Sequence, residues 1–406
     1  MRKVSTLQKI PVGQSEWSSI KAEGLLLVDK TALLPDLVKI PKVSLARPHG
    51  FGKTLLLSML EDLFTHGTHN FRNTEIRTNW PVREHYPVVR LSFSNVPSAQ
   101  EADQAADDVT AFEHGLISEL GHAYHRAGFA PEEIETYQQA ATLQGFLSQL
   151  SSLSHRKRIV FLIDDWDAPL LAHLDNKPRY DAIQKSLNVF YHWLLTLNLR
   201  FLLITGIMHF QHKYVEDISM QPDFARLLGY TQSEVEANFG AYIELETQRR
   251  HIDAYAILQL LNYQYCGFCF DEDAKVKLYS PLDINSYFAQ FHASDQTPSY
   301  GNFWLDAQGD SWLMRALIER ALAGHPAIES LDQIRYSLVE LDLQDLIKPP
   351  LFTDNALFPL LTLYGFLSIQ EPVLAKRNKR RFVCGCSNDL ITFEVLSRFV
   401  LAQKAQ

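Results

Sequence analysis

Long apolar runs, an export signal and cysteines are scarce or missing in this sequence. No stretch reaches about 18 apolar residues, so the sequence predicts no membrane-spanning helix. The basic start, MRKVSTLQKIPVGQ, is not followed by the apolar segment that a secretory signal requires. Four cysteines in a long chain without an export signal predict free thiols in a reducing compartment. We therefore expect a cytoplasmic protein.

The composition is that of a globular protein, with 46% hydrophobic and 21% charged residues. A chain of 406 residues is too long for one ordinary core, so two or three domains are expected. The net charge of −9 argues against a surface that coats nucleic acid without sequence preference, although a local basic patch is compatible with it. Internal repeats and low-complexity tracts are absent from the sequence.

In the first half of the chain, apolar runs alternate with segments of helical period, which favours a parallel sheet flanked by helices. We expect a helix over 53–64, followed by two longer helical stretches over 101–127 and 131–153. The predicted strands are 43–46, 88–93, 159–163 and 200–205, with a short fifth strand near 224–229.

From about residue 250 the character changes and helical segments dominate. Thr231 to Glu234 form a capping-box pattern that opens a helix. Further helices are expected over 251–265 and 311–322, and two short strands over 364–374 and 381–386. Two helices followed by a basic hairpin are the outline of a winged-helix module. The resulting domain prediction is 1–248 for the sheet domain, 249–335 for a helical lid and 336–406 for a winged-helix-like domain.

The segment RPHGFGKT (47–54) lies between a predicted strand and a predicted helix, the setting in which backbone N–H groups converge on a phosphate. Gly50 and Gly52 give the loop conformational freedom. Lys53 would reach the β- and γ-phosphates, and the Thr54 hydroxyl would ligate Mg²⁺. The alternative is a solvated turn that caps a helix. The predicted nucleotide-binding set is Arg47, His49, Gly50, Phe51, Gly52, Lys53, Thr54 and Leu55.

Two acids at the end of the strand 159–163 favour the phosphate-binding interpretation. In a P-loop core this strand lies beside the phosphate loop, where Asp164 would hold Mg²⁺ and Asp165 would orient the attacking water. On its own, an acidic strand end is more often a helix cap. Together with the loop, in this order along the chain, the acids predict a Mg²⁺–ATP site with Lys53 and Asp165 as catalytic residues.

The strand 88–93 comes between the loop and the acids in the sequence. This places the chain in the branch of P-loop proteins whose sheet has an extra strand between the strand before the phosphate loop and the strand that ends in the acids. That branch includes the AAA-type and STAND-type ATPases. Thr205, at the end of the fourth predicted strand, falls where a polar sensor would touch the γ-phosphate or the water. A buried threonine bonded to backbone is an equal alternative for Thr205.

Several further segments match one family along nearly the whole chain. They are VDKT (28–31), RPHGFGKTL (47–55), LIDDWDAP (162–169), TGI (205–207), GYTQSEV (229–235), GFCF (267–270), LYSPL (278–282), YGFLSI (364–369) and SN (387–388). With these segments the chain resembles the AAA-ATPase-like family of bacterial proteins that often carry a C-terminal PD-(D/E)XK nuclease. The resemblance implies an ATP-binding ATPase or switch linked to mobile elements or to defence against phage.

Three departures from the family pattern bear on activity. The family usually has glutamate where this chain has Asp165, and arginine where it has His49. Shortening that acid by about one C–C bond (~1.5 Å) withdraws its carboxylate, and a misplacement of about 1 Å can cost a hundredfold in rate. We therefore expect slow hydrolysis with retained binding. Only 20 residues follow Cys386, so we expect no nuclease activity from this sequence.

Two other interpretations stay open beside the ATPase. One is a pseudo-ATPase scaffold for protein partners or for a homo-oligomer. The other is a DNA-binding module, since a basic run near the C-terminus could grip phosphates as a wing, although an isolated charge run is more often a solvated hairpin tip. The run comprises Lys376, Arg377, Lys379, Arg380 and Arg381.

The cysteines come in two close pairs, Cys266/Cys269 and Cys384/Cys386. Four thiolates in such pairs could bind zinc. The second pair has an unusually tight spacing and the pairs are far apart in sequence, so buried free thiols are the favoured interpretation. The histidines show no metal-ligand spacing, and they are expected to be scattered over surface and core.

Overall fold

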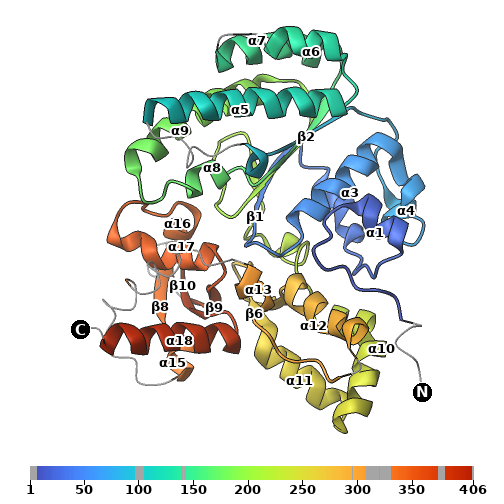
Figure 1. Cartoon of the computed structure of the whole chain (residues 1–406), viewed down its shortest axis with the longest axis vertical. Coiled ribbons are helices and arrows are strands. Elements are labelled where there is room, and N and C mark those ends of the chain that lie inside the picture. Colours follow the sequence, from blue (N-terminus) through green and yellow to red (C-terminus); the bar gives the residue numbers. More distant parts are fainter. Residues whose placement is uncertain are drawn as a thin grey trace. The chain divides into compact units, whose positions relative to one another are not determined.

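The computed structural model describes residues 7–96, 105–138, 140, 142–294, 296–307, 320, 331–373 and 380–404 (Figure 1). The described residues form two compact units. The sheet unit contains Thr31–Ala46 and Lys53–Ile218, and the second unit contains the described parts of Met1–Lys30, Arg47–Gly52 and Ser219–Gln406. The three-domain division expected from the sequence stays a prediction.

A five-stranded parallel sheet forms the centre of the sheet unit, with the order β2-β3-β4-β1-β5. Its longer strands are largely apolar because both faces are covered, as parallel sheets require. All six residues of β3, for example, are buried. The strands are β1 (Lys42–Ala46), β2 (Val88–Ser92), β3 (Ile159–Asp164), β4 (Leu199–Gly206) and β5 (Glu216–Asp217).

Helices cover both faces of this sheet (Figure 1). Helix α3 buries Leu56, Leu60 and Leu63, which recur on one helical face, and it packs on β2, β3 and β4. Helices α5 and α9 pack on each other, and α6 and α7 pack on α5. The helices of the sheet unit are α2 (Leu34–Leu37), α3 (Lys53–His66), α4 (Ile76–Asn79), α5 (Ala105–Arg126), α6 (Pro131–Gln138), α7 (Leu143–Arg156), α8 (Ala168–Leu171) and α9 (Lys177–Thr196).

The structure confirms four predicted strands and corrects two details. The fifth strand is the two-residue β5, whereas the predicted region begins at the end of the 3-10 turn Pro222–Phe224 and continues in turns. The helix predicted over 131–153 is two helices, α6 and α7. Thr142 is the N-cap of α7, because its side chain accepts a hydrogen bond from Gly145 N. The predicted separation of β3 from β1 is confirmed. Strand β4 lies between them, and it is the extra strand that the chosen branch of P-loop proteins requires.

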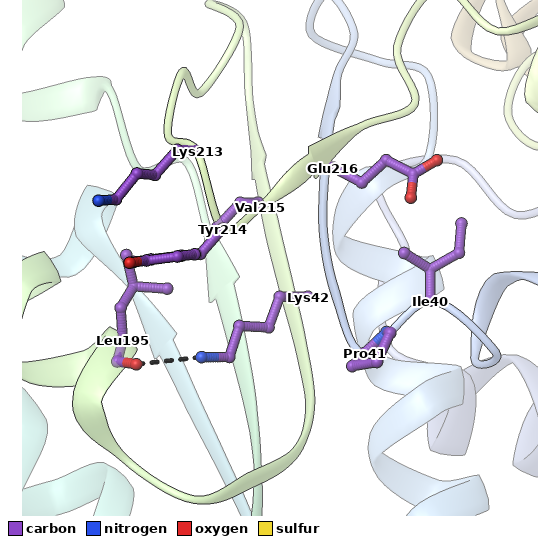
Figure 2. Close-up of a pocket in the computed structure, with 8 residues that line it drawn as sticks. All are labelled: Ile40, Pro41, Lys42, Leu195, Lys213, Tyr214, Val215 and Glu216. Atoms are coloured by element: carbon purple, nitrogen blue, oxygen red, sulfur yellow. Dashed lines mark hydrogen bonds between the residues drawn. The ribbon is translucent and has the colours of Figure 1, made fainter.

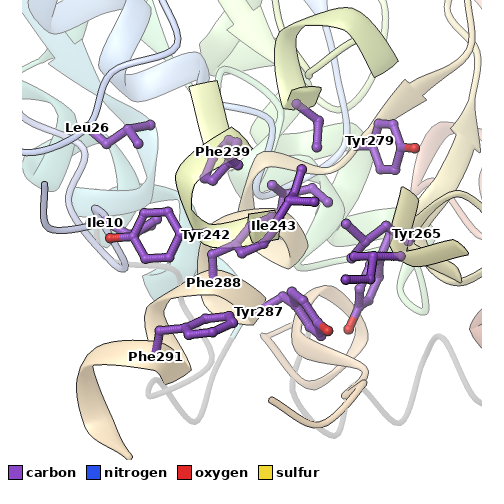
Figure 3. Close-up of a cluster of buried hydrophobic side chains, with 14 of the residues drawn as sticks. Ile10, Leu26, Phe239, Tyr242, Ile243, Tyr265, Tyr279, Tyr287, Phe288 and Phe291 are labelled. Atoms are coloured by element: carbon purple, nitrogen blue, oxygen red, sulfur yellow. The ribbon is translucent and has the colours of Figure 1, made fainter. Parts of the chain in front are cut away.

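The core of the second unit is a cluster of aromatic and aliphatic side chains (Figure 3). Phe239 and Phe288 stack with their ring centroids 4.8 Å apart, and Ile10 of the N-terminal segment belongs to the same cluster. The N-terminal segment is thereby part of this unit. The helices around the cluster and in the N-terminal segment are α1 (Trp17–Glu23), α10 (Gln232–Arg250), α11 (Ala254–Tyr265), α12 (Pro281–Ala293) and α13 (Phe303–Ala307).

Helix α10 begins at the predicted capping box. Thr231 Oγ1 accepts from Glu234 N at 3.3 Å, and the Glu234 carboxylate accepts from Thr231 N at 2.8 Å. Two backbone donors that a helix start leaves without partners are thus satisfied. This prediction is confirmed.

The last part of the second unit contains two small antiparallel sheets, with the orders β6-β7 and β8-β10-β9. The two strands expected near the C-terminus are confirmed as β9 and β10, whereas most of the helix expected over 311–322 lies outside the described residues. The elements are β6 (Cys266–Phe268), β7 (Leu278–Tyr279), α15 (Leu331–Tyr336), β8 (Val339–Asp342), α16 (Leu343–Ile347), α17 (Leu357–Leu363), β9 (Leu367–Val373), β10 (Arg381–Cys386) and α18 (Asp389–Lys404).

Candidate functional site

The predicted phosphate loop connects the end of β1 to the first residue of α3, Lys53. Gly50 and Gly52 have φ angles of +80° and +92°, in the left-handed region that glycine adopts without strain. Other side chains would be strained at both positions. The loop therefore needs its two glycines for its backbone path, and the helix N-terminus that follows favours an anion.

Lys53 and Asp165 face each other in the sheet unit. The Lys53 side chain is only 6% exposed, and its Nζ lies 4.0 Å from Asp165 Oδ1. Asp165 has a positive φ of 48°, which is rare for a residue with a side chain, and its Oδ2 accepts a hydrogen bond from Ser94 Oγ at 2.8 Å. Asp165, the predicted water-orienting acid, thus forms an ion pair with a lysine and a hydrogen bond with a serine.

Asp164 is the central acceptor of the site. Its Oδ2 accepts from Thr54 Oγ1 at 2.6 Å, and its Oδ1 accepts from Thr205 Oγ1 at 2.7 Å. Burial, and then the negative charge of Asp165, raise the pKa of Asp164 above its ordinary value, while Thr54, Thr205 and Lys53 lower it. A divalent cation beside this carboxylate would relieve the cost of its burial.

The donor chemistry at Asp164 fits Mg²⁺. The ion prefers hard oxygen ligands and keeps several waters, so one carboxylate and one hydroxyl are sufficient protein ligands. Thr54 and Asp164 already bring two such oxygens within 2.6 Å of each other. Thr205 also donates to Ile163 O at 3.2 Å, which is the backbone bond considered as its alternative role.

Hydrogen bonds join the turn after β3 to the end of β4. Asp167 is buried, and its Oδ2 accepts from the backbone N–H groups of Ile207 and Met208. Burial raises the pKa of Asp167 to about 6. A Cβ at Gly206 would lie 2.5 Å from the Trp166 ring, so only glycine fits there. Asp167 holds the two strand ends together.

The sequence interpretation did not include Ser94 or Asp167 in the site. Both follow the carboxyl ends of neighbouring parallel strands, the edge at which α/β proteins bind ligands. Ser94 lies in the 3-10 turn Phe93–Asn95 that follows β2, and Asp167 belongs to the same LIDDWDAP segment as the predicted acids. The rule that strand ends share one edge could have identified both.

Comparison with known proteins supports the same fold. The model of the AAA-ATPase-like family, described as predicted AAA-ATPase, matches residues 11–216. The chain belongs to the AAA-ATPase-like family. Its sheet order, with β4 between the strand before the phosphate loop and the strand with the acids, is that of a P-loop ATPase of this type.

A curated relative is an uncharacterized protein of the vnfD 5′ region in Azotobacter chroococcum mcd 1. It is 25% identical over 338 residues, which are 80% of this chain, and the chain spans 58% of the length of that relative. Two solved structures from Aeropyrum pernix also match at 11% identity. ORC1 in complex with DNA has a TM-score of 0.28 with 94% and 95% of the two chains covered, and ORC2 with ADPNP and ADP has 0.32 with 99% and 98%. With scores this low, the fold assignment depends on the family match and the strand order.

The side chains of the AAA-ATPase-like loop point to neighbours in the second unit. Arg47 is buried, donates from Nη1 to Ser219 O at 2.7 Å, and lies with its guanidinium carbon 4.4 Å from the centre of the Phe270 ring. Phe51 is buried against Phe268 and Phe270, while Leu55 is half-buried in α3. Arg47 belongs to the predicted nucleotide-binding set, but its guanidinium donates to the carbonyl oxygens of Ser219 and Phe224.

The predicted DNA contacts of this AAA-ATPase-like chain fall only partly within the described residues. Lys376, Arg377 and Lys379 lie outside them. Arg380 forms an ion pair with Glu272, and Arg381 pairs with Glu340 and Asp342 at 2.9 Å each. The two described arginines therefore already have carboxylate partners.

The four cysteines are free and buried, as expected. Burial raises the pKa of Cys266 to about 11, and those of Cys384 and Cys386 to about 12, so these thiols stay protonated near neutral pH. Among the residues that the structure describes, no three His, Cys, Asp or Glu side chains gather in a way that could hold a metal ion. Within the same ranges, no helix has the length and apolar character needed to cross a membrane.

A hollow of about 610 Å³ lies at the amino end of β1 (Figure 2). Lys42 and Tyr214 line it, and Lys42 Nζ donates to Leu195 O at 3.0 Å. Lys213 Nζ lies 4.7 Å from the centre of the Tyr214 ring, and Glu216 adds a negative charge. Since β1 begins at Lys42 and ends before the phosphate loop, this hollow is separate from the candidate nucleotide site.

Proposed function

We propose that the chain binds Mg²⁺–ATP through the phosphate loop and Lys53, and acts as a nucleotide-controlled switch with slow hydrolysis. The observation that carries the proposal is the convergence of Thr54 and Thr205 on the buried Asp164, with Lys53 paired to Asp165 beside them. Lys53 would exchange that carboxylate for the phosphates. Thr54 and Asp164 would hold Mg²⁺, Asp165 would orient water, and Thr205 would sense the γ-phosphate through Asp164.

Lys53→Ala is expected to abolish nucleotide binding, because it removes the cation that offsets the phosphate charge. The test is a thermal-shift titration with ATP, ADP and GTP, each with and without Mg²⁺. A ligand at about 100 times its Kd stabilises the folded state by ~2.7 kcal/mol, so a hundredfold weaker variant loses nearly the whole shift. Lys39→Ala, an exposed lysine of the same unit, is the control and should keep the shift. An equal shift with Lys53→Ala would exclude this site.

Asp165→Glu is expected to raise the rate of single-turnover ATP hydrolysis by about ten- to a hundredfold, because the longer side chain advances the carboxylate toward the water. Ser94 Oγ now holds Asp165 Oδ2 at 2.8 Å, which keeps the shorter acid at the strand edge. The measurement is product formation from radiolabelled ATP with enzyme in excess. Equal, fast rates for both proteins would reject the idea that the aspartate limits turnover.

A scaffold without turnover is the second candidate, and the Asp165 departure favours it. Such a protein would bind Mg²⁺–ATP, show no hydrolysis in either form, and use the bound nucleotide to hold a partner surface. DNA binding by the basic run has less support, because Arg380 and Arg381 are already paired with acids. Salt-dependent DNA affinity that falls when these arginines are neutralised would restore that hypothesis.

A further inference from the structure

Trp304 of α13 holds the middle of the phosphate loop within the second unit. Its indole Nε1 donates to the carbonyl oxygen of His49 at 2.8 Å, and the Trp304 side chain is nearly fully buried. A Cβ placed on Gly50 would lie 3.2 Å from the Trp304 ring and 3.2 Å from Leu282 Cβ. The loop backbone therefore rests directly on these two side chains.

This hydrogen bond also fixes the direction of the next backbone N–H group, that of Gly50. The C=O of His49 and the N–H of Gly50 belong to one planar trans peptide, so they point in opposite directions. With the carbonyl oxygen held toward the indole, the Gly50 N–H must point away from Trp304. Glycine adopts several backbone conformations at little cost, so this peptide would otherwise be free to rotate.

Trp304 is itself fixed by three separate segments. Its backbone N–H donates to the buried carboxylate of Asp283 in α12 at 2.7 Å. Its ring lies edge-on to Phe268 of β6, with centroids 5.5 Å apart, and to Phe366, just before β9, at 5.6 Å. The indole thus has one defined position relative to the loop.

The contact continues to the sheet β8-β10-β9. A Cβ on Gly365 would meet both Trp304 and Pro48 at 3.0 Å, and Gly365 adopts a left-handed φ of +90°. The turn before β9 therefore touches the loop residue Pro48 and the indole at the same point. Movement of the loop peptide would press on this turn, because closely packed groups transmit displacement.

We propose that Trp304 is a positioning residue that aims the Gly50 N–H at a bound phosphate oxygen and couples phosphate occupancy to the turn before β9. The inference rests on the proposed function, since it needs a polyphosphate in the loop. Coupling is reciprocal at equilibrium: whatever displaces Trp304 weakens phosphate binding by the same factor by which phosphate opposes the displacement.

The test compares Trp304→Phe, which keeps an aromatic ring but lacks the N–H, with Phe366→Leu, which removes a ring contact but keeps the indole. We expect Trp304→Phe to weaken Mg²⁺–ATP binding about five- to tenfold, the usual effect of one lost hydrogen bond. Phe366→Leu should change the Kd less than twofold. Affinity for Mg²⁺–ATP is measured by calorimetry, with adenosine as the probe that lacks phosphate; its affinity should not change.

A second measurement observes the Trp304 indole directly. In the native chain labelled with ¹⁵N-tryptophan, saturating Mg²⁺–ATP should shift the Trp304 indole N–H resonance, assigned as the one missing from Trp304→Phe, and adenosine should not. If the native chain binds Mg²⁺–ATP but Trp304→Phe binds equally well and no indole resonance moves, the positioning role is wrong and the proposed function stands. If the native chain and Lys53→Ala both fail to bind Mg²⁺–ATP, both proposals are rejected together.

Discussion

Asp164→Asn is expected to slow single-turnover ATP hydrolysis by about a thousandfold and to remove the Mg²⁺-dependent part of ATP affinity. Asparagine keeps the shape and an oxygen that can accept from Thr54 or Thr205, but it carries no charge to hold the cation. A thousandfold corresponds to roughly 4 kcal/mol in the barrier, a size typical of lost cation stabilisation. The measurement is hydrolysis by excess enzyme and ATP titration at several Mg²⁺ concentrations.

Asp167→Asn is the matched control for this prediction. Asp167 is as buried as Asp164 and lies three residues away, but its carboxylate accepts from the backbone of Ile207 and Met208. The asparagine oxygen can take over this role, so the Mg²⁺ dependence should survive. Because native turnover is expected to be slow, both substitutions are also made in the Asp165→Glu background. Unchanged Mg²⁺ dependence in Asp164→Asn would remove Asp164 from the cation site.

Gly267→Ala is expected to destabilise the second unit by more than about 4 kcal/mol or to prevent its folding. Gly267 lies in β6 with a φ of +139°, and an added Cβ would stand 1.9 Å from the carbonyl oxygen of Ser387. No rotamer relieves a clash between Cβ and backbone, so β6 or the turn between β10 and α18 would have to move. Urea unfolding followed by circular dichroism, together with soluble yield, measures the effect.

Gly240→Ala tests whether the loss is specific. Gly240 lies inside α10, and an added Cβ would meet nothing within 4 Å beyond its chain neighbours and the backbone of its own helix. Alanine favours helices over glycine by ~0.5–1 kcal/mol. This variant should be as stable as the native chain or more so. A Gly267→Ala protein with native stability would show that β6 and Ser387 do not approach as closely as described.

The predictable part of the fold is the part that short-range patterns determine. Uninterrupted apolar runs such as IVFLI (159–163) predicted buried strands, and the order of loop, strand and acids predicted the P-loop core. The start of α10 followed from Thr231 and Glu234 alone, because a capping box is local. Thr54, Asp164 and Thr205 were predicted to share one site from their positions in the P-loop pattern.

The remainder depended on contacts between distant residues. Strand β5 has two residues, too few for a period to show, and the apolar residues near Phe224 fill turns instead of a strand. Nothing in the sequence near Arg47 indicates that its guanidinium donates to Ser219, 172 positions away. The bond from Trp304 to His49 spans 255 positions, and no local pattern encodes it.

One carboxylate at the start of α10 serves two purposes. Glu234 Oε2 accepts from Thr231 N at 2.8 Å and also pairs with Lys30 Nζ at 2.5 Å. Burial lowers the pKa of Lys30, and the neighbouring Glu234 charge opposes that shift. A chain trimmed at residue 30 would leave Glu234 with only its backbone donor and would also remove Ile10 and Leu26 from the aromatic cluster. Residues 7–30 thus belong to the packing of the second unit, so engineered removal of that segment would destabilise the first turn of α10.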